Sequence, residues 1–158
     1  MNLRNYRFKL WLLGRFKIPL IGLCRPHLLE MTNEKIVVKL PLYFFTKNHY
    51  GSMYFGAQAV GADLAAGYLG YALCHELNLD SGLVFKDFKA NFLKRPESDV
   101  YFVCTQGEAI RLQVAESLST GSRVTRDVTV DAFTHYETPK QELVSTFVLG
   151  LSLKVKKR

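Results

Sequence analysis

The feature that most restricts the fold is the stretch from Met53 to Cys74, in which Asp63 is the only charged residue among 22. Its length would allow a helix to cross a bilayer. Its four glycines weaken an isolated helix, however, and a carboxylate near the bilayer centre is costly. Because a helix that is apolar on all sides must be buried, we expect a long central helix, at about residues 53–75, enclosed by a sheet rather than by lipid.

Six segments around this helix have the composition or the alternation of β-strands, two before it and four after it. They are His27–Met31, Lys35–Leu40, Leu83–Lys94, Val100–Thr105, Val124–Ala132 and Leu143–Val155. An amphipathic helix is expected at Glu108–Leu118, but no helices alternate regularly with the strands, so the sheet should be antiparallel. The sequence predicts an α+β fold in which an antiparallel sheet of five to six strands wraps one helix. Such a sheet leaves edges open, which favours a dimer.

The net charge of +7 is concentrated at the two ends of the chain. Residues 1–26 contain six basic residues and no acidic one, and Lys154–Arg158 adds four more basic residues. We therefore divide the chain into a basic N-terminal helical extension at 1–26, with an amphipathic helix at about Asn5–Phe16, and a single domain at 27–158. Basic ends suit anionic lipid, nucleic acid or phosphorylated ligands, and a solvated tail is the alternative. No RNA-binding or helix-turn-helix motif supports nucleic acid, whereas a weak membrane-surface contact through the N-terminus stays open.

The three cysteines, Cys24, Cys74 and Cys104, are odd in number and widely spaced. No CxxC motif is present, so neither a zinc site nor a redox pair is expected. Reduced buried thiols are typical of a cytoplasmic protein. We expect no metal and no cofactor.

The loop before the long helix, together with the first turns of that helix, contains the candidate chemical groups. Asn48 and His49 precede a helix N-terminus, where unpaired N–H groups and the positive end of the dipole face outward. Gly56 would allow a ligand atom to approach the backbone, and Asp63, seven residues later, lies on nearly the same face. This set suits attack of water on a carbonyl. The alternatives are a capping role for Asn48, a surface histidine, a packing glycine, and an ion pair of Asp63 with a Lys or Arg from another strand.

The layout of the elements and the segment Asn48–Gly67 resemble the hot-dog fold, in which an antiparallel sheet wraps a long helix. The most similar branch is that of the PaaI-like acyl-CoA thioesterases, and within it uncharacterised bacterial proteins similar to the C-terminal domain of YiiD. The segment Lys86–Pro96 also resembles that group. The resemblance implies a single hot-dog domain and a homodimer or tetramer with sites built at the dimer interface.

The family motif has an Asn, a His-Gly-Gly whose last Gly lies eight residues later, and an Asp seven residues after that. Asn48, Gly56 and Asp63 fit these spacings. The resemblance implies that Asp63 is the general base or nucleophile, that the backbone N–H near Gly56 polarises the thioester carbonyl, and that Asn48 orients the carbonyl or water. Tyr54 and Phe55 depart from the motif, because they replace the His and the first Gly. The residues expected to contact substrate are His49, Gly51, Met53, Tyr54, Phe55 and Arg95.

The predicted function is hydrolysis of an acyl thioester carried by CoA or by an acyl carrier protein. The alternative is a hot-dog protein that binds fatty-acyl groups or acyl-CoA without catalysis, which the departures at Tyr54 and Phe55 favour. A hot-dog hydratase is less favoured, because Asp63 lies far along the helix.

Overall fold

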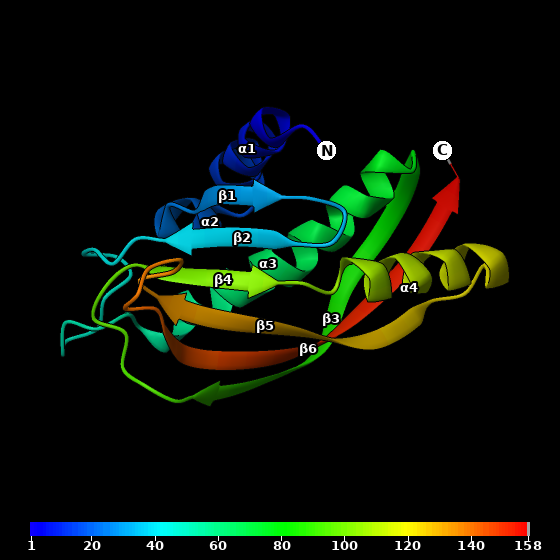
Figure 1. Ribbon diagram of the computed structural model, residues 1–158. Helices are drawn as coiled ribbons and strands as arrows, with labels where there is room; N and C mark the ends of the chain where they lie inside the picture. The colour runs from blue at the N-terminus through cyan, green and yellow to red at the C-terminus, as the bar shows by residue number, and fades with distance from the viewer. Residues whose placement is uncertain (158) are drawn as a thin grey trace.

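The structure of this protein is a computed structural model that describes residues 1–157. Its helices are α1 (Leu3–Leu12), the π-helical segment η1 (Leu13–Lys17), α2 (Pro19–Cys24), α3 (Phe55–Glu76) and α4 (Gly107–Thr120). Its strands are β1 (His27–Met31), β2 (Ile36–Leu40), β3 (Leu79–Phe92), β4 (Val100–Cys104), β5 (Val124–Thr134) and β6 (Glu142–Lys157). The long helix α3 crosses one face of the sheet, while α1 and α2 lie beside β1 and β2 (Figure 1).

The six strands form one sheet in the order β1-β2-β4-β5-β6-β3, and every neighbouring pair is antiparallel. The longest pairing joins β3 to β6, from Leu79 opposite Lys157 to Phe92 opposite Ser145, with an irregularity between Phe85 and Phe88. Because β3 is the last strand in the order, one of its edges has no strand beside it among residues 1–157. The predicted α+β fold with a wrapped central helix is confirmed.

The central helix α3 spans 55–76, close to the expected 53–75, and it packs against β2, β3, β4, β5 and β6. Most of the sheet-facing residues are small or apolar, which brings the helix close to the strands. At Gly61 an added Cβ would lie 2.3 Å from the Phe102 ring, so only glycine fits there without a shift of that ring. The glycines that weaken an isolated helix therefore allow this one to pack tightly in the core.

The turn between α3 and β3 is shorter than expected. Asn78 adopts a left-handed backbone conformation with φ of 58°, which asparagine tolerates better than most residues, and the strand begins at Leu79 rather than at Leu83. Residues 80–82, expected to form a turn, belong to the strand instead. Their side chains alternate between the two faces of the strand, so Ser81 and Leu83 are partly covered while their neighbours are exposed.

The N-terminal segments α1, η1 and α2 form a helical hairpin that packs on the core. Tyr6 is buried, its hydroxyl donates to Glu76 Oε1 at 2.7 Å, and Tyr68 donates to the Tyr6 carbonyl at 2.7 Å. The two arms of the hairpin meet at Gly14 and Gly22, where an added Cβ on Gly22 would lie 2.4 Å from the Gly14 carbonyl oxygen. Residues 3–24 are therefore ordered by specific contacts rather than being a solvated tail. Among residues 1–157, none of the helices is both long and apolar enough to span a bilayer.

Candidate functional site

One stripe of α3 is left partly uncovered by the sheet. Its members recur at helical spacing along the whole helix, and each of them is partly or largely accessible: Gly56, Val60, Asp63, Gly67 and Tyr71. The residues on the opposite side of the helix are buried. The expectation that Gly56 and Asp63 share a helix face agrees with this arrangement, and the stripe is where a ligand or a second chain can reach α3.

Asp63 lines a cavity of about 600 Å³, which we call the Asp63 cavity. Its walls come from three parts of the fold. The hairpin contributes Lys9, Leu12, Leu13, Phe16, Lys17, Ile18 and Ile21, α3 contributes Asp63, Leu64, Gly67, Tyr68 and Tyr71, and β3 contributes Ser81 and Leu83. Most of these side chains are apolar. The cavity therefore offers a hydrophobic space with one carboxylate in its wall.

The Asp63 carboxylate has no hydrogen-bond or ion-pair partner among residues 1–157. Two lysines, Lys9 and Lys17, also line the cavity, but neither pairs with Asp63, and Lys9 Nζ lies 2.6 Å from His75 Nε2. Burial raises the pKa of the Asp63 carboxyl above its ordinary value, because desolvation disfavours the charged form. An unpaired carboxyl with a raised pKa in a cavity is suited to proton transfer. The ion pair considered from the sequence is absent from the described residues.

Asn48 lies in the loop before α3 and organises that loop. Its Oδ1 accepts from the Tyr50 N–H at 3.0 Å, from the Ser52 N–H at 3.2 Å and from the Ser52 hydroxyl at 3.2 Å. Gly51 completes the turn with a φ of 81°, a conformation that favours glycine. The side-chain oxygen is thus fully engaged, as the capping alternative predicted, while the Nδ2 group has no partner among residues 1–157.

The loop and the helix start surround a second cavity of about 500 Å³, which we call the loop cavity. It is lined by Asn48, His49, Tyr50, Ser52, Met53, Tyr54, Phe55, Gln58 and residues 92–96. His49 is exposed and its ring lies 3.9 Å from that of Tyr50, while Arg95 is held by Glu97 at 2.6 Å. The structure therefore brings six of the predicted site residues to this one cavity: Asn48, His49, Met53, Tyr54, Phe55 and Arg95.

The N-terminus of α3 leaves backbone donors available beside the loop cavity. The first intrahelical hydrogen bond runs from Gln58 N to Tyr54 O, and no side chain caps the helix. The N–H groups of residues 55–57 therefore precede the helical ladder. The Tyr54 ring lies against Gly56, and a Cβ added at this glycine would be only 2.5 Å from the ring. The departure from the family motif at Tyr54 thus occupies the space next to the proposed oxyanion donor.

Within one chain, Asp63 and Asn48 line different cavities: the Asp63 cavity includes Asp63, Gly67 and Tyr71 of the open stripe, whereas the loop cavity lies at the first turn of α3. Two polar residues that sequence reasoning missed also line these cavities. Ser81 faces the Asp63 cavity, and Gln58 in the loop cavity accepts from the Ser145 hydroxyl at 2.6 Å. A strand beginning at Leu79 would have placed Ser81 on the inner face by alternation. No sequence signal marked Gln58.

The fold is shared with solved structures from several organisms. A Shewanella oneidensis protein provisionally named a thioesterase superposes with a TM-score of 0.78 at 18% identity, covering 97% of this chain and 99% of that one. A Pseudomonas aeruginosa protein of unknown function, also provisionally assigned to the thioesterases, gives 0.78 at 18% identity over 99% and 97% of the two chains. A Haemophilus influenzae thioesterase gives 0.65 at 16% identity over 97% and 90%.

The sequence itself matches no protein-family model and none of the curated proteins. At these identities the structural likeness establishes the fold, and the chain has the hot-dog fold of thioesterase-superfamily proteins. The predicted resemblance is thereby confirmed at the level of the fold.

Proposed function

We propose that this protein hydrolyses an acyl thioester, with Asp63 as the reactive group. The observation that supports the proposal best is the unpaired Asp63 carboxyl in the wall of a largely apolar cavity beside the central helix of a hot-dog fold. An apolar cavity suits an acyl chain, and a carboxyl whose pKa is raised is a stronger base when it is ionised.

Two chemical routes are open to the carboxylate. As a general base, Asp63 takes a proton from water while the water oxygen attacks the carbonyl carbon; the C–S bond then breaks, and the leaving thiolate takes that proton. As a nucleophile, a carboxylate oxygen attacks the carbonyl, the thiolate leaves, and water cleaves the resulting anhydride. In both routes the N–H groups at the start of α3, near Gly56, would stabilise the oxyanion, and Asn48 Nδ2 would orient the carbonyl.

A homodimer would bring the two cavities together. The edge of β3 that faces away from β6 is unpaired within the chain, and its exposed apolar side chains include Val84, Phe88 and Phe92. A long edge of this kind is a template for pairing with another strand. We propose that a second copy pairs along β3, so that the Asp63 of one copy works with the Asn48 loop of the other. Two such dimers could assemble into a tetramer.

The proposal extends to the carrier and the compartment. CoA or an acyl carrier protein would present the thioester, and a phosphate of the carrier would take the place of Glu97 on Arg95 at the rim of the loop cavity. The buried free cysteines are consistent with the cytoplasm, and no cofactor is needed.

The second candidate function is binding of fatty-acyl groups or acyl-CoA without turnover. The observation that favours it is the Tyr54 ring over Gly56, which fills the approach to the helix N-terminus. In that case the Asp63 cavity would hold an acyl chain whose thioester stays intact.

The experiment follows thiol release from acyl-CoAs of short, medium and long chain, and from acylated carrier protein, for the wild type and two variants. Asp63→Asn should lower kcat/KM by about 10²–10⁴-fold, the usual contribution of a general base. Asp127→Asn is the matched control, because Asp127 is exposed on β5. Full activity of Asp63→Asn would overturn the assignment of the residue. Tight acyl-CoA binding without thiol release from any substrate would favour the second candidate, and sedimentation of the wild type would show whether it is a dimer.

A further inference from the structure

The outward face of the first arm of the hairpin, formed by α1 and η1, combines basic and aromatic residues at helical spacing. Arg4, Phe8, Trp11 and Arg15 follow one another at intervals of four, three and four residues, so they lie on one face. The Phe8 and Trp11 rings stack with centroids 5.9 Å apart, and Trp11 meets Phe16 edge-on at 6.2 Å. These three aromatic side chains are 58%, 57% and 65% exposed.

The second arm of the hairpin extends this surface. Ile18, Leu20 and Leu23 are all exposed at or within α2, next to the aromatic row. A single exposed apolar side chain is ordinary, but six of them on one small hairpin indicate an interaction surface. The inner faces of the two arms are buried against the core through Tyr6 and Ile21, so the outer face is left exposed within the chain.

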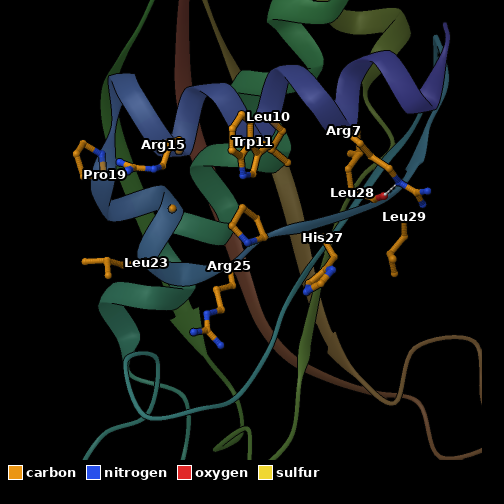
Figure 2. Close-up of a pocket in the computed structure, with 13 residues that line it drawn as sticks. Arg7, Leu10, Trp11, Arg15, Pro19, Leu23, Arg25, His27, Leu28 and Leu29 are labelled. Atoms are coloured by element: carbon orange, nitrogen blue, oxygen red, sulfur yellow. Dashed lines mark hydrogen bonds between the residues drawn. The ribbon is translucent and has the colours of Figure 1, made fainter.

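A cavity of about 1020 Å³ opens between the hairpin and β1, and we call it the basic cavity. Four basic side chains lie around it, from both arms of the hairpin and from the start of β1 (Figure 2): Arg7, Arg15, Arg25 and His27. Between them the walls are apolar, formed by side chains such as Leu10, Trp11, Leu23 and Leu28. No acidic residue lines the cavity, and the first acidic residue of the chain is Glu30.

The charges of these arginines are not neutralised by the protein. Arg7 Nε donates to the Leu28 carbonyl at 2.7 Å, and Arg15 and Arg25 lie over the rings of Phe16 and Tyr43 at 5.4 and 4.6 Å. None of the three pairs with a carboxylate among residues 1–157. The surface therefore offers positive charge beside exposed aromatic rings, and it needs an anionic partner with an apolar part.

We propose that the outer face of the hairpin is a docking surface for an anionic phospholipid membrane. Headgroup phosphates would pair with the arginines around the basic cavity, while Trp11, Phe8 and Phe16 would insert at the boundary of headgroups and acyl chains. A second copy of the same face would instead oppose these arginines with an identical set of arginines. The exposed aromatic and aliphatic side chains likewise distinguish this surface from a basic surface that binds phosphate groups through charge alone.

The docking surface adjoins the Asp63 cavity, because Phe16 and Ile18 belong to both. Membrane docking would thus place the wall of that cavity near the acyl chains of the bilayer. The docking itself does not depend on hydrolysis, and its experiment needs no substrate.

The experiment uses the full chain and its own fluorescence, because Trp11 is the only tryptophan. The probes are vesicles of phosphatidylcholine alone and vesicles of phosphatidylcholine with an equal amount of phosphatidylglycerol. We expect co-sedimentation and a blue shift of Trp11 emission with the anionic vesicles only, weakened by added salt. Binding without a shift of Trp11 emission would overturn the proposal. The proposal would also be overturned if Trp11 emission were already blue-shifted without vesicles and moved to the red on dilution. That result would show that a second copy of the chain covers the surface.

Paired variants locate the contact. Arg15→Gln combined with Arg25→Gln should weaken partition to anionic vesicles about 30-fold, because each of the two arginines strengthens binding to an anionic membrane by a similar factor. Lys156→Gln combined with Lys157→Gln removes the same charge at the other end of the chain and should change partition little. Circular dichroism checks that both pairs fold. An equal loss of vesicle partition in the two pairs would show that net charge alone drives binding, and would overturn the docking surface. Complete release of the protein from the vesicles by inorganic phosphate would also overturn it.

Discussion

The Asp63 cavity and the loop cavity both border α3 but differ in how their polar groups are satisfied. In the loop cavity the Asn48 oxygen accepts three hydrogen bonds and Arg95 is paired with Glu97. In the Asp63 cavity the one carboxylate has no partner among residues 1–157, and burial raises its pKa. Paired polar groups like those of the loop cavity help to hold a structure together. A buried carboxylate without a partner, like Asp63, reduces stability and is retained where it has a chemical role.

The largest effect that would sharpen this comparison is expected at Asn48. Asn48→Ala removes the acceptor of three hydrogen bonds and leaves the buried Ser52 with unpaired donors, so unfolding free energy should fall by about 2 kcal/mol. Asn48→Asp keeps the acceptor oxygens and should retain most of the stability. Urea denaturation of the three proteins measures both effects.

The same pair of Asn48 variants separates structure from catalysis. If the Nδ2 group orients the thioester, Asn48→Asp should unfold like the wild type yet release less thiol. Equal activity of Asn48→Asp and wild type would assign Asn48 to the loop alone.

A smaller effect of opposite sign is expected at Asp63. Its folded-state pKa is raised, so the native state binds the proton more tightly than the unfolded state, and stability falls as pH rises from the ordinary Asp pKa through the raised one. Asp63→Asn should therefore be more stable than the wild type at neutral pH, by about 1 kcal/mol. The difference should shrink as the pH is lowered through the raised pKa to about 3, below the ordinary Asp pKa, where the wild-type carboxyl is protonated in both states.

Thermal unfolding at both pH values tests the Asp63 prediction. Asp127→Asn, at an exposed position, should show no such gain. A stability gain of Asp63→Asn that is equal at both pH values would contradict the raised pKa as its cause.

The smallest effect is expected at His49. Its side chain is exposed and packs beside the Tyr50 ring, so His49→Ala should change the unfolding free energy by less than about 0.5 kcal/mol. A loss of thiol release without a loss of stability would show that His49 takes over the role of the missing motif histidine. It would also make the loop cavity as chemically important as the Asp63 cavity.

The sequence was informative where periodicity decides the structure. The boundaries of α3 were predicted to within two residues, because an unbroken apolar helix can lie only inside the sheet. The alternation in β5 and β6 likewise predicted strands close to those observed. The start of β3 was missed, since the Asp80-Ser81-Gly82 composition is typical of turns and the reversal at Asn78 needs only one left-handed residue.

The site was predictable as a set of residues but not as a geometry. The spacing of Gly56 and Asp63 placed both on one stripe of α3, as observed. The sequence could not show that the Tyr54 ring lies over Gly56, or that Asn48 Oδ1 is consumed by the loop, because side-chain conformations are set by contacts distant in sequence. The hairpin wall of the Asp63 cavity was missed for the same reason, since the close crossing of Gly14 and Gly22 has no periodic signal.

The position of the hairpin has a consequence for how acyl preference would be encoded. Phe16, Ile18 and Ile21 supply one wall of the Asp63 cavity, while the carboxylate stands on α3. Chain-length selection and bond cleavage would then be encoded in different segments, joined only by packing. Larger or smaller side chains in the hairpin would change the length of acyl chain that the cavity accepts, while Asp63 and α3 stay unchanged. The first two dozen residues would then set the chain-length preference.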